Sequence, residues 1–407
     1  MAAWFGAFTI YAGAVAAFTG HEDRAWAVFA FGCYALSAIL LRFGRSWWPG
    51  LAVALAGALI APFAWLATQE QDTAEVKVIG RAAGHVLKYG TPYLPTSQLQ
   101  DWRSYNPYLP VMEVFGLPRS AGLHGIAGDP RVWTSLATLA LLVIAFAIMA
   151  PHGLRGCADC RDRVVRLTVI AMASPVIAFP LALGITDPPV IALICVALAC
   201  VSRGWVGRAS LAVAIACAMK YTAWPVLPVF AVMLWMRYQA KAAAGFAGTT
   251  VGMAAFLALL AAPDAMAQPD SLVQNTVAFP LGLTHHKTPA ASPLPGHLLS
   301  ELGPAGHVAA VALMGVAAVA FAAWLLLRPP LTHQSVAWRL AVGYAGMFLL
   351  APATRFGYFA YPLCLLGWLV LTNYQPHVHA ERALATVPRR LSHWWGRPGE
   401  RSEPSTP

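Results

Sequence analysis

A209SLAVAIACAMKYTAWPVLPVFAVMLWM236 is the stretch that decides the fold, and Lys220 is its only charged residue. The stretch is longer than the about 20 apolar residues that a helix needs to cross a bilayer. It is flanked by Arg208 and Arg237, and basic residues mark the cytoplasmic side of a membrane, so both ends should be cytoplasmic. The stretch therefore predicts a hairpin of two half-helices that breaks between Lys220 and Pro225 on the outer side, with Lys220 facing a cavity.

Apolar stretches of similar character run through the rest of the chain. They cover residues 3–19, 25–41, 50–67, 132–150, 164–183, 187–202, 245–262, 305–327, 337–351 and 357–373. Together with the hairpin they predict an all-α integral membrane protein of about twelve transmembrane helices. The basic residues lie mostly in the short connections, which places both the N- and the C-terminus in the cytoplasm of a multi-pass cell-membrane protein.

The composition agrees with a membrane protein. Hydrophobic residues make up 58% of the chain and charged residues 11%, whereas soluble domains carry about 25% charged residues. The net charge of +10 would suggest nucleic acid as a partner of a soluble protein. Here the basic residues are topology signals, so we expect membrane lipids and not nucleic acid as partners.

Two long connections and a basic tail complete the organisation. Residues 1–375 are predicted to form one transmembrane domain, with extracytoplasmic loops at about 68–131 and 263–304, both much longer than the usual connection between helices. The first loop is rich in aromatic residues and should be folded. The tail, residues 376–407, is basic and proline-rich, and we expect it to be cytoplasmic and disordered.

Asp72 is the candidate catalytic residue. Acidic residues are scarce, and Glu70, Asp72 and Glu75 directly follow the third apolar segment, at the membrane–water boundary. A carboxylate at that depth could take a proton from a sugar hydroxyl while a lipid-linked substrate stays in the bilayer. The alternative is a solvated start of a helix, because acidic first turns are common. The lack of a tight acidic pair argues against a metal, with Glu70 and Asp72 as the one pair that keeps a metal open, and no cofactor is expected.

Cationic residues at the same depth are candidates for binding a phosphate group. Lys220 and Arg355 stand at predicted outer ends of apolar segments, and His285 and His286 lie in the second outer loop. Arginine holds phosphate as a fork and lysine as a point charge. The alternative for the lysine and the arginine is snorkelling to the interface or pairing with a loop carboxylate, and for the histidines it is simple solvation.

Further outer-face residues are candidates for substrate binding. Asp187 precedes two prolines and would serve equally well as a helix start. Tyr105, Tyr108 and Tyr358 could stack on sugars, although aromatic belts are a common feature of membrane interfaces.

Five motifs give the chain a resemblance to a known family. They are D72TAEVKVIGRAAGHVLKYGTPY93, S104YNPYLP110, T186DPP189, K220YTAWP225 and T354RFGYFAYP362. With these motifs the chain resembles the membrane glycosyltransferases of family 87, multi-spanning GT-C enzymes that use polyprenyl-phosphate sugars. Asp72 occupies the position of that family's outer-loop Asp, although two more apolar segments precede it here than in most members.

The resemblance implies an inverting, metal-independent transferase of the cell envelope. Asp72 would deprotonate the acceptor, a lipid or a glycan, while Lys220, Arg355 and His286 would hold the phosphate of the polyprenyl-phosphate-linked donor. Mannose is the sugar that the resemblance favours, and arabinose or glucose stay open. A secondary transporter and a non-catalytic membrane scaffold are the alternative classes. A transporter should show two similar halves, and only one interrupted hairpin is evident.

Overall fold

The computed structural model describes residues 1–68, 73–150, 158–286 and 288–373. Within these ranges every regular element is a helix, apart from one isolated bridge between Ala291 and Thr354. This part of the chain confirms the all-α class. The chain divides into two units, Met1–Leu369 and Val370–Pro407, and nearly all of the helices belong to the first. The predicted tail at 376–407 lies outside the described residues.

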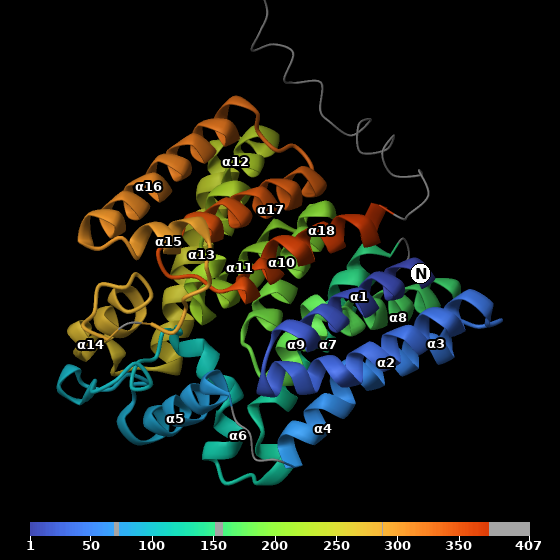
Figure 1. Cartoon of the computed structure of the whole chain (residues 1–407). Coiled ribbons are helices and arrows are strands. Elements are labelled where there is room, and N and C mark those ends of the chain that lie inside the picture. The colour runs from blue at the N-terminus through green and yellow to red at the C-terminus, as the bar shows by residue number, and fades with distance from the viewer. Residues whose placement is uncertain (69–72, 151–157, 287, 374–407) are drawn as a thin grey trace, which may run out of the picture. The chain divides into compact units, whose positions relative to one another are not determined.

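The N-terminal helices form a tightly packed group. They are α1 (Ala2–Phe18), α2 (His21–Phe43), α3 (Trp48–Leu55) and α4 (Ala61–Thr68), with the π-helical turn Ala56–Ile60 between the last two. Figure 1 shows α1, α2, α3 and α8 (Ala158–Ala173) next to one another. The buried Tyr34 donates a hydrogen bond of 2.6 Å to the carbonyl of Ala173, and Trp26 donates one of 2.7 Å to the carbonyl of Ala58. These bonds tie the N-terminal hairpin to the following helices.

The centre of the structure is α10 (Asp187–Ser202), which is buried almost from end to end. Its neighbours are α7 (Pro130–Met149), α9 (Pro175–Leu183), α11 (Val206–Met219) and α17 (His333–Leu350). A helix that is apolar on all sides belongs inside a bundle, because none of its faces suits water. The helices α8 and α9 meet at an angle of 61°.

The predicted break at Lys220 is confirmed. The helix α11 ends at Met219, a short 3-10 turn follows at Tyr221–Ala223, and α12 (Val226–Tyr238) begins after Pro225. The helix α13 (Ala240–Ala261) packs against both half-helices.

Two contacts of Phe246 on α13 show how the half-helices run. Its carbonyl accepts a 3.0 Å hydrogen bond from Ser210 near the start of α11, and its ring stacks on Phe230 of α12. The Tyr238 hydroxyl at the end of α12 also lies next to Gly204, just before α11. The half-helices therefore run in opposite directions, which brings Arg208 and Arg237 to the same end, as the hairpin requires.

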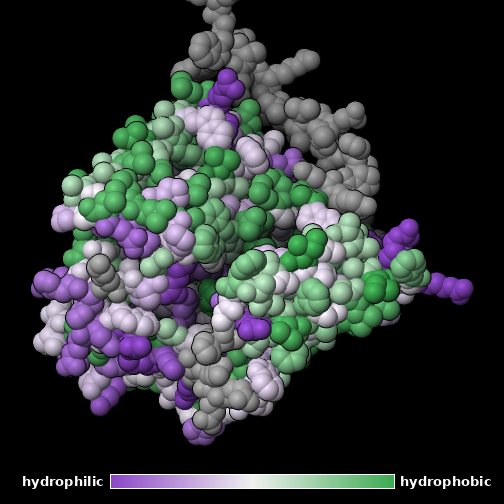
Figure 2. All heavy atoms as spheres, viewed as in Figure 1, coloured by the Kyte–Doolittle hydropathy of each residue, from purple (hydrophilic) through white to green (hydrophobic). Residues whose placement is uncertain are grey.

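The two long loops fold into short helices at the other end of the bundle. The first loop carries α5 (Ala74–Tyr89), a 3-10 helix at Pro110–Phe115 and α6 (Leu117–Ser120); the second carries α14 (Pro269–Val273), a π-helical turn at Gln274–Ala278 and α15 (Pro295–Ser300). The chain continues with α16 (Pro304–Leu327), α17 and α18 (Ala360–Asn373). Figure 2 shows hydrophilic residues gathered where Figure 1 draws α5 and α14, and mostly hydrophobic residues over the long helices. This division suits a protein whose helices face lipid.

Among the described residues, five helices are long and apolar enough to cross a bilayer, or six if the bent pair α8–α9 is one span. The five spans are Asp23–Phe43, Trp48–Thr68, Pro130–Met149, Ala240–Ala261 and Pro304–Leu327. Four shorter apolar helices, of 10–17 residues, accompany them. A multi-spanning membrane protein is therefore supported, whereas the predicted count of about twelve crossings is not confirmed.

Candidate active site

Lys220 stands at the break between the half-helices, where the backbone is extended and the side chain turns into the bundle. Its ammonium nitrogen donates to Oδ1 of Asp187 at 2.6 Å and to Oγ1 of Thr186 at 3.2 Å. The rings of Tyr108 and Tyr358 lie 5.4 and 5.6 Å from the same nitrogen. An ammonium can approach aromatic rings at this distance because their faces carry negative charge. The side chain of Lys220 is only 10% exposed, so these groups replace most of its water.

Asp187 is the first residue of α10, and Pro188 and Pro189 follow it in the first helical turn. The start of a helix favours a carboxylate because the backbone N–H groups there carry partial positive charge. The Tyr361 hydroxyl donates to Oδ1 of Asp187 at 2.8 Å and lies 2.6 Å from the hydroxyl of Thr222. The buried charge of Asp187 is thus balanced by an ammonium and a phenol hydroxyl.

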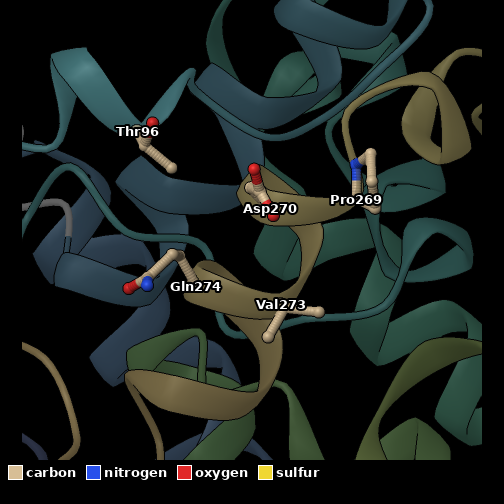
Figure 3. A pocket seen from close by; sticks show the side chains of 5 residues that line it. All are labelled: Thr96, Pro269, Asp270, Val273 and Gln274. Carbon is tan, nitrogen blue, oxygen red and sulfur yellow. The ribbon is translucent and has the colours of Figure 1, made fainter.

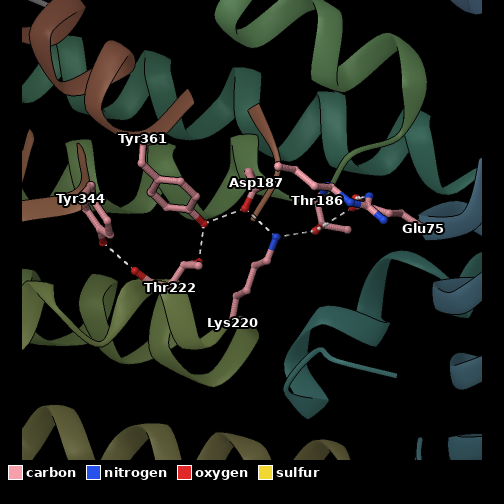
Figure 4. Close-up of polar contacts among 8 residues, drawn as sticks. Glu75, Thr186, Asp187, Lys220, Thr222, Tyr344 and Tyr361 are labelled. Atoms are coloured by element: carbon pink, nitrogen blue, oxygen red, sulfur yellow. Dashed lines mark hydrogen bonds and ion pairs between the residues drawn. The ribbon is translucent and has the colours of Figure 1, made fainter. Parts of the chain in front are cut away.

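A second carboxylate, Glu75, lies on the other side of Thr186. It belongs to the first turn of α5, and its Oε2 accepts hydrogen bonds of 3.2 Å from both the backbone N–H and the hydroxyl of Thr186. Its Oε1 lies 3.4 Å from Nη1 of Arg355, whose side chain is 37% exposed. Figure 4 shows the resulting chain of contacts from Glu75 through Thr186 and Lys220 to Asp187 and Tyr361. Two acids and two bases alternate within a few ångströms.

A cavity of about 430 Å³ opens beside this cluster. Glu75, Lys220 and Arg355 line it, together with Tyr108 and Tyr358. The rest of the wall is largely apolar or aromatic and includes Trp102, Tyr105, Pro107, Val277, Phe279, Leu281, Pro289, Met314, Met347 and Phe348. Cavities of this size, apolar with a few convergent polar groups, are the usual form of small-molecule sites.

The predicted site residues differ in whether they meet at the cluster, line the cavity or do neither. Lys220, Arg355, Asp187, Tyr108 and Tyr358 come together at the cluster. Tyr105 also lines the cavity, and its ring stacks on that of Phe279 with centroids 4.3 Å apart. The two histidines do neither. His286 lies with its ring 6.2 Å from that of Tyr105, His285 is exposed, and neither histidine lines the cavity.

Asp72, the predicted catalytic residue, and Glu70 lie outside the described residues. Asp72 precedes the cavity-lining Ala74 by two positions in the chain. Of the three acids at this turn, the one that the structure places at the cluster is Glu75, three residues after Asp72.

A second hollow, of about 400 Å³, lies on the two long loops (Figure 3). It is lined by Thr96, Pro269, Asp270, Val273 and Gln274, all of them exposed residues. None of these residues belongs to the five sequence motifs, and the cluster around Lys220 remains the stronger candidate for chemistry.

A family model described as glycosyltransferase family 87 matches residues 108–352, which is more than half of the chain. The chain belongs to glycosyltransferase family 87. No curated protein and no solved structure matches it. The matched segment of this family 87 protein contains Tyr108, Asp187 and Lys220 of the cluster, whereas Asp72, Glu75 and Arg355 lie outside it. Membership makes the protein an enzyme that transfers a sugar, and this decides against the transporter and the scaffold.

Sequence reasoning missed three members of the family 87 enzyme's cluster as site residues. Each of the three lies inside a motif that carries the resemblance: Glu75 in the motif 72–93, Thr186 in T186DPP189 and Tyr361 in T354RFGYFAYP362. The motifs were therefore a usable signal for all three. Within the motif 72–93, however, the sequence analysis assigns the catalytic role to Asp72 and no role to Glu75.

The loop wall of the cavity depends on a buried carboxyl group, Glu113. Its Oε1 accepts a 2.8 Å hydrogen bond from the Asn106 side chain, while Oε2 has no hydrogen-bond partner within the described ranges. Asn106 in turn accepts from the backbone N–H of Tyr108, and its own N–H donates to Asn275 of the second loop. Burial raises the pKa of Glu113 to about 8, and the Asn106 bond opposes the rise only in part.

We expect Glu113→Gln to remove a loss of stability at alkaline pH. The Glu113 carboxyl ionises near pH 4.5 in the unfolded chain and near pH 8 in the folded protein. Its contribution to the free energy of unfolding is therefore complete below pH 4.5 and is lost as the pH rises through about 8. The Tm of the wild type should therefore fall between about pH 5 and pH 8, whereas that of Glu113→Gln should fall less. Asp270→Asn, at an exposed position, is the control. An unchanged pH dependence in Glu113→Gln would contradict this assignment.

Proposed function

We propose that this enzyme transfers a sugar, with mannose as the first candidate, from a polyprenyl-phosphate donor to a glycolipid or glycan acceptor on the outer side of the membrane, with inversion at the anomeric carbon. The observation that carries the proposal is the cavity in which a carboxylate and two cations meet an apolar wall. A lipid-linked phosphate sugar has the same division, with a long apolar chain on one side of a charged group and a polyol on the other.

The two cations suit the phosphate of such a donor. The guanidinium of Arg355 is held on one side by Glu75 and is still 37% exposed, and Lys220 lines the same cavity. Glu75 fixes the orientation of Arg355 before the donor arrives. Cations that are already in place stabilise the charge that develops on a leaving phosphate without any reorganisation.

The apolar wall suits the polyprenyl chain. Met314 of α16 and Met347 and Phe348 of α17 border the cavity, and α16 presents mostly exposed apolar residues along its length. A chain of isoprenoid units could pass from lipid to the cations along this wall without crossing polar surface.

In the proposed reaction, Asp72 accepts the proton of the acceptor hydroxyl. The hydroxyl oxygen then forms a bond to the anomeric carbon as the bond from that carbon to the phosphate oxygen breaks, and polyprenyl phosphate leaves with the electron pair. Asp72 is proposed as the base because it precedes the cavity-lining Ala74 by two residues, whereas the carboxylate of Glu75 already accepts from Thr186 and lies beside the guanidinium of Arg355.

The proposal includes the topology. About twelve crossings, with both termini in the cytoplasm, follow if the shorter apolar helices and both half-helices cross as well. The basic residues Arg208 and Arg237 lie at one end of the hairpin and the cavity at the other, which supports an outer position for the site.

The decisive test uses the purified full-length protein in nanodiscs with a synthetic mannoside acceptor. Mannosyl phosphoryl polyprenol should support transfer, whereas GDP-mannose should not, because the cavity offers an apolar wall and the described residues around it show no cradle for a nucleotide. Transfer from the nucleotide sugar alone would overturn the choice of donor. Glucosyl and arabinosyl phosphoryl polyprenols, tested in parallel, identify the sugar.

A further inference from the structure

The cavity has a second wall that the donor does not need. Trp102, Tyr105 and Pro107, all from the first outer loop, line the same cavity as the apolar residues of α16 and α17. Tyr105 is 5% exposed and covered by the ring of Phe279, whereas Trp102 is only partly buried. Trp102 is therefore the larger aromatic surface that this wall offers to a ligand.

Contacts within its own loop hold Trp102 in place. The carboxylate of Asp101 accepts from the backbone N–H of Ser104 at 3.0 Å and from its hydroxyl at 2.9 Å, which closes a tight turn around Trp102. The guanidinium of Arg103 lies 4.5 Å from the centroid of the indole ring. Such a stack supports the ring from one side.

Arg81 of α5 also holds this turn. Its guanidinium donates to the backbone carbonyls of Arg103, Ser104 and Tyr105, at 2.5, 3.1 and 3.2 Å. One side chain thus occupies three successive carbonyls of a loop. A loop ordered before binding saves the conformational entropy that a mobile loop would lose when a ligand binds.

A fixed, partly exposed indole beside a catalytic cavity suits a sugar ring. The C–H face of a pyranose is apolar and packs on aromatic rings, while its hydroxyls remain free to meet polar groups of the cavity such as the carboxylate of Glu75. We propose that Trp102 is the platform that binds the sugar end of the acceptor, so that this enzyme extends a glycan and does not glycosylate a bare lipid alcohol. This inference rests on the proposed function.

The first test measures Trp102→Ala kinetics with mannosyl phosphoryl polyprenol and methyl α-mannobioside. The KM for the mannobioside should rise on the order of tenfold, the scale of one lost aromatic stack, while the KM for the donor stays unchanged. Trp102→Phe should recover part of the effect, and Arg81→Met should resemble Trp102→Ala in a milder form. Trp235→Ala, at an exposed tryptophan of α12, is the matched control.

A second readout needs no donor and separates this inference from the proposed function. Saturation-transfer NMR with methyl α-mannobioside should show binding to the wild type and its loss in Trp102→Ala. A rise in the donor KM alone would assign Trp102 to the lipid donor and overturn the inference. Equal binding of the mannobioside by both proteins, or by neither, would overturn it as well, whichever donor the enzyme uses.

Discussion

Asp72→Asn should lower the rate of sugar transfer by roughly 10²-fold or more, the scale of a lost general base. Asparagine keeps the shape of the side chain and its capacity for hydrogen bonds but cannot accept the proton of the acceptor hydroxyl. The variant should still insert into the membrane and bind the donor. The measurement is the initial rate of transfer in nanodiscs at saturating donor and acceptor, together with the donor KM.

Three neighbouring acids are the controls. Asp101→Asn should leave the rate at saturating acceptor nearly unchanged, because this carboxylate is half exposed and bonds Ser104 in the turn around Trp102, so that its loss acts on acceptor binding. Glu70→Gln should be equally mild. Glu75→Gln should weaken donor binding more than the chemical step, since Glu75 holds Arg355. A fully active Asp72→Asn with an inactive Glu75→Gln would move the base to Glu75, and full activity of all four variants would refute acid–base catalysis at this turn.

Lys220→Met should affect folding and donor binding together. It leaves the carboxylate of Asp187 buried, with its 2.6 Å ammonium partner gone. Removing one member of a buried ion pair costs about 3–5 kcal/mol, so the Tm in detergent should fall by many degrees. Loss of a phosphate contact should also raise the donor KM by at least about tenfold. Lys241→Met, at an exposed position, is the control.

The double variant Lys220→Met/Asp187→Asn separates the two effects. With both charges removed, stability should return toward the wild-type value, because no unpaired charge remains buried. The donor KM should stay high if Lys220 binds phosphate. Recovery of both stability and donor affinity would show that Lys220 has a purely structural role.

The apolar pattern of the sequence predicted the helical fold, and the hairpin at Lys220 shows why such a prediction works. A charged residue and a proline within one apolar run are costly in any uninterrupted membrane helix, so the break could be predicted without knowing its neighbours. Matching basic residues at both ends of the run then fixed the direction of the two halves. The bend between α8 and α9 was not predicted, although Pro175 stands at it, because no charged residue accompanies this proline as Lys220 accompanies Pro225.

The candidate site was predictable only where residues lie inside a recognisable motif. Lys220, Asp187 and Arg355 stand in motifs and meet at the cluster. His285 and His286 looked equally suitable as cations in a long loop, yet neither of them lines the cavity. A position in a loop does not say which surface the side chain reaches.

The sequence by itself determined that this is an all-helical membrane protein and that its apolar stretch 209–236 is interrupted at Lys220. It also determined the family to which the protein belongs. These properties follow from hydropathy and local motifs, which involve residues close together in the chain. Only the tertiary structure decided that Glu75 and Arg355, far apart in the sequence, hold one another, that Thr186 joins Glu75 to Lys220, and that Trp102 faces the same cavity. Such contacts depend on how the helices and loops pack in three dimensions, and packing is set by many weak contacts between distant residues at once.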